Sequence, residues 1–477
     1  MSGNQEVRLR DLNRTGRTAV VIGGSMAGLL AARVLSEHFD QVTILEKDPV
    51  EDLPQTRRGQ PQARHAHGLL GHGLEILEAF FPGLTDELVA GGAIAADMGE
   101  AIRWYQYGGY RRQFHSGLTG IVLSRPFLEW RIRRRVLGLP NVTIQAGMRV
   151  ECLIPNRDID RITELQVRDG QSGNALRGLV ADLFVDASGR GSRTPSWLTE
   201  LGYPRPAREE VRVDVGYASR IYRRRPDDRL VGELVMILPS PPNDKRMAFL
   251  LPMEHDRWIV TAGGWHGQPL PTDGRALMRF LRDLQVPDIF QVVKDAEPLS
   301  DIVTHKFPSS RRLRFERLAR FPDGYLVIGD ALASFTPVYA QGMTAAAMQA
   351  RALAGLLQNR RCLAGMWRSY FNEMANVVDD IWQLAVSEDF RFPETRGNKR
   401  PATDLLNWYV GRVHRATHRD TVVYGQFLRV MNLLVPASSL MQPRILARVL
   451  YDSLRQWGSA PSGSQGRMKS MTDVARS

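Results

Sequence analysis

The first regular hydrophobic pattern of the chain begins after a polar lead of about seventeen residues. An apolar, mostly β-branched run at residues 19–22 is typical of a buried parallel strand. Glycines follow, and residues 26–39 then place apolar side chains at helical spacing before a second apolar run at 42–45. This strand–helix–strand order predicts an α/β domain at the start of the chain.

The middle of the chain alternates between apolar and polar residues in the manner of β-sheet. Residues 141–190 predict strands, with a turn at Asp169-Gly170 and another glycine at Gly173. Residues 211–306 predict an antiparallel sheet that is inserted between two parts of the α/β domain. A buried strand at 325–328 returns to that domain, and helical spacing continues from 343 to about 457. The predicted division is 18–210 and 307–360 for the α/β domain, 211–306 for the inserted sheet, 361–457 for a helical region, and 458–477 for a disordered tail.

Composition adds a soluble, globular character to this picture. Apolar residues make up 43% of the 477 residues and charged residues 24%. The net charge of +12 comes mostly from arginines in short groups among apolar residues, which indicates solvated faces and not a nucleic-acid site. No signal peptide or run of about 18 apolar residues is visible, so we expect a cytoplasmic protein. Cys152 and Cys362 predict two buried thiols in a reducing compartment.

The glycine-rich turn after the first strand carries the first chemical signal. Gly23-Gly24-Ser25-Met26-Ala27-Gly28 follows the dinucleotide-binding pattern, in which small residues let a helix N-terminus approach a pyrophosphate. Ser25 replaces the middle glycine of that pattern, and serine is small enough to serve. Glu46 closes the second strand, where an acidic side chain can accept hydrogen bonds from an adenosine ribose. The arrangement predicts an adenine dinucleotide.

A second pattern, about 300 residues later, selects the dinucleotide. Gly329-Asp330 follows a buried strand, and Gln341-Gly342-Met343 opens a helix. An aspartate at a strand end can bind a ribityl chain, and a helix N-terminus can face the flavin ring where negative charge builds on reduction. The two patterns together predict FAD. No second dinucleotide motif is visible, so reducing equivalents are expected from NAD(P)H binding transiently or from a partner flavin reductase.

Residues 18–360 resemble the FAD-dependent monooxygenases of the para-hydroxybenzoate hydroxylase superfamily. The segment Asp186-Ala187-Ser188-Gly189-Arg190 is an altered form of that superfamily's Asp-Gly motif. The segments 57–67, Arg-Arg-Gly-Gln-Pro-Gln-Ala-Arg-His-Ala-His, and 329–343 look closer still to the flavin epoxidases of polyether antibiotic pathways, with squalene-epoxidase-like proteins more distant. The implied fold is α/β, or α+β overall: a glutathione-reductase-like Rossmann FAD domain, an inserted antiparallel substrate sheet and C-terminal helices.

The resemblance also implies a set of cofactor residues. Gly23, Gly24, Ser25, Ala27 and Gly28 would hold the pyrophosphate and Glu46 the ribose, and Met26 and Lys47 belong to the same predicted set. Arg57 and Arg125 would contact the phosphates or the ribityl chain, and Val150 the adenine through its backbone. Asp330 would bind the cofactor chain, and Gly342 and Met343 would face the flavin. No catalytic residue and no metal ligand is assigned.

The implied reaction inserts one oxygen atom from O2, through a flavin hydroperoxide, into a lipophilic polyketide or isoprenoid alkene. Alkene epoxidation needs no catalytic base, because no proton has to leave the substrate first. Two alternatives stay open: a flavin-dependent reductase of isoprenoid double bonds, and a flavoprotein that binds a lipophilic ligand without turnover. A halogenase is disfavoured, because no lysine occurs between Lys47 and Lys245 for the chlorinating role.

Three groups of side chains remain as candidates on the substrate side. The aromatic residues Tyr217, Phe249, Trp258 and Trp265 on the inserted sheet suit an apolar ligand, or form ordinary sheet core. His65 and His67 are expected on one side of a strand, shaping the flavin pocket or simply ordering a loop, and not holding a metal. The apolar stripes of 427–435 and 445–454 predict a helical cap, with membrane contact or a dimer interface as alternatives.

Overall fold

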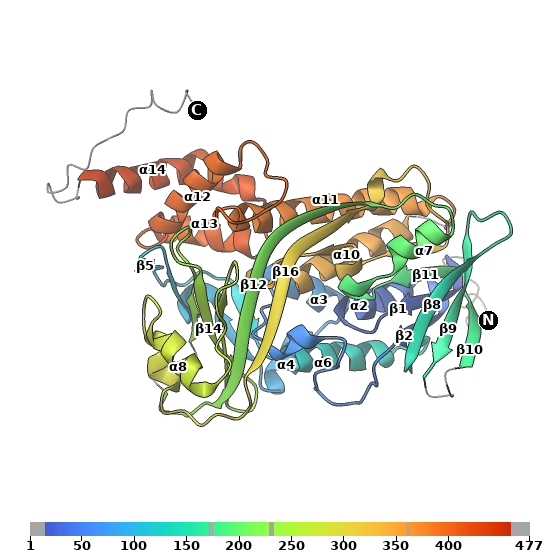
Figure 1. The fold of residues 1–477 in the computed structure, drawn as a ribbon, viewed down its shortest axis with the longest axis horizontal. Coiled ribbons are helices and arrows are strands. Elements are labelled where there is room, and N and C mark those ends of the chain that lie inside the picture. The colour runs from blue at the N-terminus through green and yellow to red at the C-terminus, as the bar shows by residue number, and fades with distance from the viewer. Residues whose placement is uncertain (1–14, 171–172, 174, 229–232, 360–361, 459–477) are drawn as a thin grey trace, which may run out of the picture.

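The computed structural model describes residues 15–458, apart from 171–172, 174, 229–232 and 360–361. A parallel sheet and a larger, mainly antiparallel sheet lie side by side, and C-terminal helices run along one edge of both (Figure 1). This is the mixed α/β architecture that the sequence predicts, so the fold class is confirmed. The predicted tail at 458–477 lies, except for its first residue, outside the described residues. Among the described residues, no helix has both the length and the apolar character needed to cross a bilayer.

The parallel sheet is built around the first strand of the chain. Its strand order is β17-β11-β1-β2-β7, and every neighbouring pair is parallel. The strands are β1 (Gly16–Ile22), β2 (Phe39–Glu46), β7 (Val142–Ala146), β11 (Leu183–Asp186) and β17 (Tyr325–Val327). Residues 19–22 are buried throughout, because both faces of a parallel sheet are covered.

The first helix is shorter than its hydrophobic pattern suggests. Helix α2 (Met26–Leu35) ends four residues before Phe39, where β2 already begins. Phe39 is fully buried, and its ring lies against Gly16, where an added Cβ would come within 2.7 Å of it. Phe39 therefore fits the helical period by spacing, but its side chain belongs to the core of the sheet.

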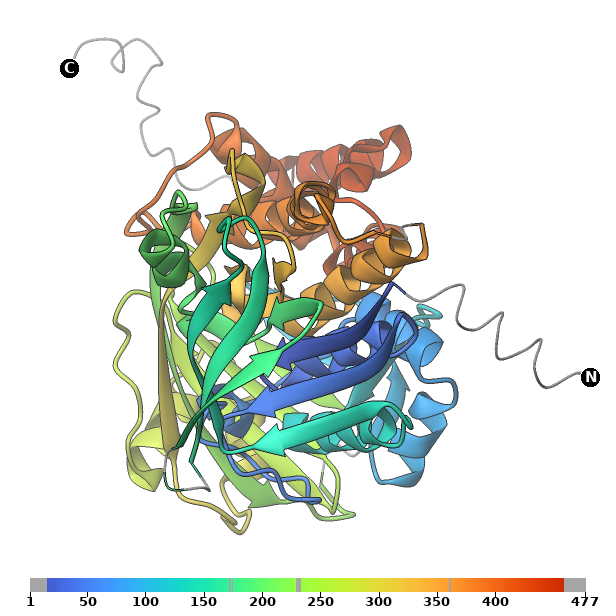
Figure 2. The same cartoon turned by 90° about the vertical axis from the view of Figure 1, so that its right-hand side faces the viewer.

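A three-stranded antiparallel sheet, in the order β10-β9-β8, flanks the parallel sheet (Figure 2). It comprises β8 (Met148–Pro155), β9 (Ile162–Asp169) and β10 (Ala175–Val180), so the strands and the turn predicted within 141–190 are present. The helices and short turns of this half are α3 (Gly71–Phe80), α4 (Leu84–Ala90), α6 (Arg125–Leu137), α7 (Thr194–Glu200), α10 (Gln341–Gln358), η1 (Pro61–Arg64), η2 (Gly189–Gly191), η4 (Gly329–Ala331) and η5 (Pro337–Tyr339). Helices α2 and α10 pack against each other.

The larger sheet has eight strands in the order β18-β16-β12-β15-β14-β13-β4-β5. They are β4 (Ile102–Gln106), β5 (Gly109–Tyr110), β12 (Ala207–Arg223), β13 (Leu234–Ile237), β14 (Arg246–Met253), β15 (Arg257–Gly264), β16 (Val303–Arg314) and β18 (Ala333–Ser334). All neighbours are antiparallel except β13 and β4. The sheet thus takes strands from both sides of 211–306, and its long strands β12 and β16 cross the centre of Figure 1. A separate pair joins β3 (Ile94–Asp97) to β6 (Thr119–Val122), next to α5 (Met98–Ala101).

The face of this sheet that points away from the parallel sheet has a core of its own. Helices α8 (Gly274–Arg282) and α9 (Asp288–Val293) cover it, although strand-like alternation predicts only sheet here. Trp258 is fully buried in this second core, and its Nε1 donates to Asp228 at 2.7 Å. Trp258 is therefore an ordinary core residue, which is the second of the two alternatives that the sequence leaves open for it, and it is not a substrate-side residue.

The C-terminal helices continue the main hydrophobic core. They are α11 (Met366–Asp389), α12 (Thr403–Ala416), α13 (Thr421–Met431) and α14 (Pro443–Gly458), with short turns η3 (Phe315–Arg317) and η6 (Ala437–Met441). Phe371 of α11 stacks on Phe315 with ring centroids 4.9 Å apart. Helix α14 buries Ile445 and Val449. The prediction of two buried thiols is wrong, because Cys152 is half-buried and Cys362 is exposed.

Candidate cofactor and substrate site

The glycine-rich turn brings β1 and α2 into very close contact. A Cβ added at Gly28 would lie 1.8 Å from the carbonyl oxygen of Gly23, so only glycine fits this crossing. Gly23 itself has φ of 104° and donates its N–H to Leu45 O at 2.8 Å. Ser25 is the N-cap of α2, but its side chain does not cap the helix. The first N–H groups of α2 therefore remain available to an anion, as pyrophosphate binding requires.

Glu46 fastens this turn to the end of β2. Its Oε2 accepts the N–H of Gly24 at 2.9 Å and forms an ion pair with Arg57 Nη1 at 2.8 Å, and its Oε1 accepts the N–H of Asp48 at 3.0 Å. Arg57 also donates to Gly24 O at 2.9 Å. Glu46 and Arg57 thus lie together beside the turn, which puts Arg57 on the side predicted for the adenosine ribose.

A buried carboxylate that the sequence does not reveal links the two predicted arginines. Glu129 on α6 pairs with Arg57 and accepts the Ser25 hydroxyl at 2.9 Å. Burial alone would lower the pKa of Arg57, but Glu129 and Glu46 raise it overall, so the guanidinium stays charged. Arg125, the first residue of α6, reaches Ser25 Oγ at 3.3 Å. Glu129 was missed because an i, i+4 partner of Arg125 on a helix has no distinctive sequence signal.

The second motif meets the first in space. Gly329 has φ of 69°, and an added Cβ there would lie 2.5 Å from the Cβ of Ala27 on α2. Asp330 stays exposed between the buried Gly329 and Ala331. The surrounding protein nevertheless raises its pKa, while Arg125, Arg190 and Arg311 act in the opposite direction. The Asp330 carboxyl group is thus in contact with water and is also surrounded by protein, as in a recess of the surface.

Helix α10 presents a second uncapped N-terminus. Its N-cap, Ala340, has φ of 56° and no capping side chain, and an added Cβ at Gly342 meets no atom within 4 Å. Gln341 Oε1 and Thr344 Oγ1 are buried without a hydrogen-bond partner in the described part of the chain. The start of α10 therefore offers open space, free N–H groups and unpaired acceptors. These features fit the polar edge of a flavin ring, which accepts electrons, so the residues present suit FAD.

Lys47, Val150 and Met343 are the predicted residues with least direct support. Lys47 is exposed, and its side chain lies close to Gly59. Val150 is buried on β8, and Met343 is buried in the first turn of α10. Their contacts with a cofactor stay predictions.

The face of the large sheet that points toward the parallel sheet is mainly apolar. Trp104, Met236, Phe249 and Thr261 lie side by side on neighbouring strands, and Met236 and Phe249 are half-buried. Tyr217 lies on the same face. We call this face the inner sheet face. Two of the four predicted aromatic residues, Tyr217 and Phe249, therefore lie where an apolar ligand could contact them.

Trp265 instead belongs to a buried polar cluster around Asp389 of α11. Its Nε1 donates to Asp389 at 3.2 Å, and the hydroxyl groups of Thr336 and Tyr339 donate to the same carboxylate at 2.8 and 2.9 Å. Asp389 is fully buried, and burial raises its pKa to about 7. Tyr339 belongs to η5, directly before α10, so this cluster ties α11 to the flavin-side turn. A single aspartate in a long helix gives no sequence signal for it.

His65 and His67 do not lie on a strand, so that expectation is wrong. They follow the turn η1, which Pro61 opens, in a segment without regular structure. His65 Nδ1 lies 2.8 Å from Ser219 Oγ, and His67 Nε2 lies 3.4 Å from Arg125 Nη1. The two rings are therefore held by the inner sheet face and by α6 respectively.

Known proteins with similar sequences and folds can now be compared with this site. The chain matches no family profile. It is 34% identical over 459 residues to protein Rv3254 of Mycobacterium tuberculosis, covering 92% of this chain and 94% of that protein. It is 24% identical over 355 residues to kynurenine 3-monooxygenase of Salinispora tropica, covering 70% and 71%. The chain belongs to the family of Rv3254, within the superfamily of FAD-dependent monooxygenases.

Several solved flavoprotein and oxygenase structures share the fold. A flavoprotein/dehydrogenase from Cytophaga hutchinsonii superposes with a TM-score of 0.64 at 15% identity, over 93% of this chain and 100% of that chain. The flavin-dependent brominase Bmp2 gives 0.62 at 15% identity, over 92% and 98%. A 2-methyl-3-hydroxypyridine-5-carboxylic acid oxygenase gives 0.57 at 16% identity, over 88% and 98%. One fold therefore accommodates several flavin chemistries, so the reaction has to be argued from the site.

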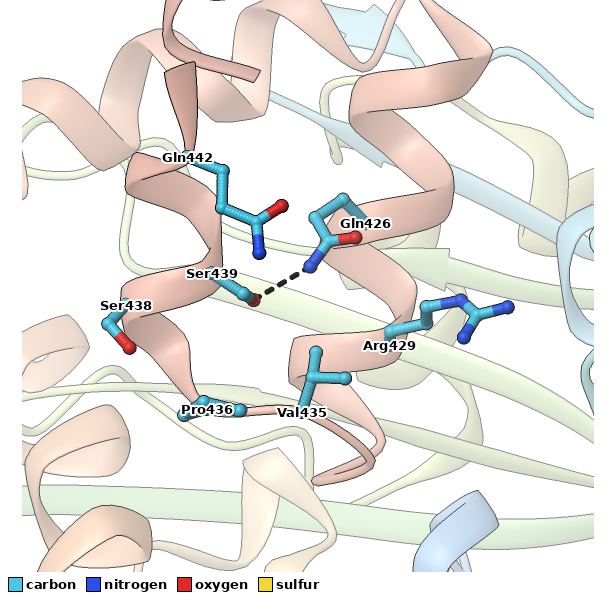
Figure 3. A pocket seen from close by; sticks show the side chains of 7 residues that line it. All are labelled: Gln426, Arg429, Val435, Pro436, Ser438, Ser439 and Gln442. Carbon is cyan, nitrogen blue, oxygen red and sulfur yellow. Dashed lines mark hydrogen bonds between the residues drawn. The ribbon is translucent and has the colours of Figure 1, made fainter. Parts of the chain in front are cut away.

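Two other features of the monooxygenase fold lie apart from the cofactor residues. A groove of about 450 Å³ between α13 and η6 is lined by residues such as Arg429 and Gln426, whose Nε2 donates to Ser439 Oγ at 2.7 Å (Figure 3). Asp97, Glu100 and His115 also bring three possible ligand atoms within 4.8 Å of one another. Asp97 already accepts several backbone and hydroxyl hydrogen bonds, so we assign no metal to this cluster.

Proposed function

We propose that this protein is an FAD-dependent monooxygenase that transfers one oxygen atom from O2 to an alkene of a lipophilic polyketide or isoprenoid substrate. The supporting observation is that two helices with uncapped N-termini begin from motifs that meet in space. Helices α2 and α10 start from motifs about 300 residues apart, and these motifs are so close that a Cβ added at Gly329 would lie 2.5 Å from the Cβ of Ala27. Bound FAD would supply the oxygen-activating chemistry.

Each protein group has a distinct part in this proposal. The N–H groups at the start of α2, with Arg125 and Ser25, would bind the pyrophosphate. Asp330 would accept hydrogen bonds from the ribityl chain, and the start of α10 would stabilise negative charge on the ring. Glu46 and Arg57 would bind on the ribose side, and the inner sheet face would position the substrate and exclude water.

The inner sheet face favours an apolar substrate and a reaction without a base. Met236 and Phe249 are half-buried and apolar. Burial lowers the pKa values of His65 and His67 to about 3, so both rings are neutral at physiological pH. Alkene epoxidation agrees with this, since no substrate proton has to be removed before oxygen transfer.

Oxygen-18 labelling tests the proposal. FAD-loaded protein is supplied with NAD(P)H or a flavin reductase, with 18O2, and with a panel of polyene lipids. We expect a product heavier by one 18O atom. A product with a saturated double bond would show an isoprenoid reductase. Flavin binding without turnover across the panel would show a ligand-binding flavoprotein.

The same assay with added bromide distinguishes oxygenation from halogenation. Addition of bromide should leave the product unbrominated, because Lys245, the first lysine after Lys47, is engaged in an ion pair with Glu394 at 2.5 Å. A brominated product would refute the assignment as an epoxidase.

A further inference from the structure

The segment from His65 to Gly68 lies where the cofactor residues meet the inner sheet face. A Cβ added at Gly68 would come within 3.1 Å of the Cβ of Ala340, the N-cap of α10. His67 contacts Arg125 at the start of α6, and His65 contacts Ser219 on β12. A polar group offered by this segment is therefore well placed to contact a substrate bound between the flavin and the sheet.

A short relay of hydrogen bonds holds His65 at its Nδ1 side. The backbone N–H of Ala66 donates to Thr261 Oγ1 at 3.0 Å. Thr261 Oγ1 lies 2.6 Å from Ser219 Oγ, and Ser219 Oγ lies 2.8 Å from His65 Nδ1. Thr261 and Ser219 are both buried. Each hydroxyl group has one proton, so the relay can run in only one of two directions.

The direction of the relay is selected by the requirement that every hydroxyl proton in it has an acceptor. If Thr261 donates to Ser219, then Ser219 donates to His65 Nδ1 and every hydroxyl proton in the relay is used. In the opposite direction His65 Nδ1–H donates to Ser219, which donates to Thr261. The hydroxyl proton of Thr261 then has no acceptor among the described residues. A buried donor without an acceptor is costly, so the first direction is favoured.

This direction fixes the tautomer of His65. Nδ1 is an acceptor, so the ring proton is on Nε2. The ring is neutral, because burial first, and then the neighbouring His305 and Arg64, lower its pKa to about 3. Nε2 makes no hydrogen bond to the described residues, and it is not among the buried, unpartnered atoms, unlike Nε2 of His414. His65 therefore has a free N–H donor.

His67 is held in the opposite tautomer. Its Nδ1 lies 2.9 Å from the carbonyl oxygen of His65, which can only accept, so Nδ1 carries the proton. Its Nε2 then accepts from Arg125, whose Nη1 lies 3.4 Å away. Both nitrogens of His67 are thus engaged, and within this pair only His65 can donate to a ligand.

The surroundings of His65 indicate what its Nε2–H binds. Tyr217 packs edge-on against the ring at 4.6 Å, and the row Ser219–Thr261–Phe249–Met236 runs across the inner sheet face beside it. Thr261 and Ser219 are used in the relay, and the rest of this row is apolar. The site therefore combines the neutral His65 donor, near the polar groups of Tyr217 and His305, with an apolar surface, which suits a lipophilic molecule with an acceptor oxygen.

We propose that His65 is a specificity-determining residue whose Nε2–H donates to a hydroxyl, ether or carbonyl oxygen of the alkene substrate and so selects the double bond that is oxidised. This deepens the function proposed above and rests on it. An N–H donor that pairs with a substrate oxygen discriminates strongly against an analogue that lacks this oxygen, because the donor is then left without an acceptor.

The tautomer is tested without turnover. Protein labelled with 15N-histidine and loaded with FAD is examined by NMR, and the His65 signals are identified by their absence in His65→Gln. We expect an unprotonated Nδ1 and a protonated Nε2. Thr261→Val removes the hydroxyl that drives the relay and should allow Nδ1 protonation, whereas Thr261→Ser, the matched control, should not. A protonated Nδ1 in the wild type overturns the proposal.

The ligand is tested with farnesol and with the hydrocarbon of the same skeleton that lacks the hydroxyl group. Binding is read from the perturbed flavin absorption spectrum and turnover from product mass. We expect wild-type protein to prefer farnesol by roughly tenfold, the factor of one neutral hydrogen bond. His65→Leu should abolish the preference mainly through KM, and His65→Gln, whose amide reaches a similar position, should retain part of it.

The outcomes separate this inference from the proposed function. Equal binding of the two probes by the wild type, or a preference that survives in His65→Leu, overturns the role of His65 even if both probes are oxygenated. Protein that binds no FAD, or oxygenates no alkene, refutes the proposed function, while the NMR measurement still decides whether His65 has a free donor.

Discussion

Gly28 gives the sharpest test of the cofactor site. A Cβ at this position would lie 1.8 Å from Gly23 O and 2.9 Å from Gly23 C, distances that atoms in folded proteins do not adopt. Gly23 cannot retreat easily, because its N–H bonds Leu45 O at 2.8 Å and its φ of 104° suits only glycine. In Gly28→Ala, α2 must therefore move by more than about 1 Å, and it carries its free N–H groups with it.

The size of the effect follows from the cost of overpacking. Inserting one methyl group into a tight contact typically costs about 1–3 kcal/mol. If that cost falls on the bound geometry, the Kd for FAD rises roughly 5- to 150-fold. Gly28→Val adds a branched side chain in the same contact and should abolish binding.

Flavin fluorescence quenching measures Kd, and urea unfolding measures stability. Gly355→Ala on α10 is the matched control, because Gly355 is exposed and an added Cβ meets no atom within 4 Å. We expect it to leave Kd unchanged and to stabilise the protein by up to about 1 kcal/mol. If Gly28→Ala binds FAD as tightly as Gly355→Ala, the reasoning about the β1–α2 crossing is refuted.

Three further predictions concern the buried charges and the C-terminal helices. Glu46→Ala leaves the buried Arg57 with one carboxylate fewer and should lower the free energy of unfolding by about 3 kcal/mol in urea denaturation; a loss below about 1 kcal/mol would contradict it. The raised pKa of Asp389 means that its protonated form stabilises the folded state below about pH 4 and that this stabilisation is lost as the pH rises through about 7. Asp389→Asn should remove that slope from the pH profile of the urea midpoint, and an unchanged profile would rule the argument out. Deleting residues 437–477 removes α14, so we expect insoluble protein, and we expect the full-length protein not to sediment with anionic lipid vesicles; sedimentation would instead support membrane contact through Leu450, Tyr451 and Leu454, which are exposed on α14.

Sequence reasoning succeeded where a signal is local. The run at 19–22, the glycine-rich turn and Glu46 lie within 28 residues, and the glycines of the turn meet a backbone requirement that other residue types do not. Strand alternation likewise predicts β12 to β15, because period-two burial follows from the geometry of a strand. It gives no warning of α8 and α9, which begin beyond the last of these strands.

Sequence reasoning failed where a side chain has two plausible environments. Trp258 and Phe249 alternate equally well, but only the packing of α8 and α9 shows that Trp258 belongs to the outer core. The pair His65 and His67 reads as one side of a strand, yet Pro61 and the turn η1 place it in an irregular segment.

The sequence alone determined that this protein has a dinucleotide-type α/β domain with two flavin-type motifs. The residues of each motif are close in sequence, so they determine the local backbone geometry by themselves. Only the tertiary structure decided that Ala27 meets Gly329, that Glu129 joins Arg57 to Ser25, and that Asp389 binds the turn before α10. These contacts join residues up to about 300 positions apart. Their partners are ordinary glutamates, threonines and tyrosines, whose roles depend on which neighbours the folded chain brings within hydrogen-bonding distance.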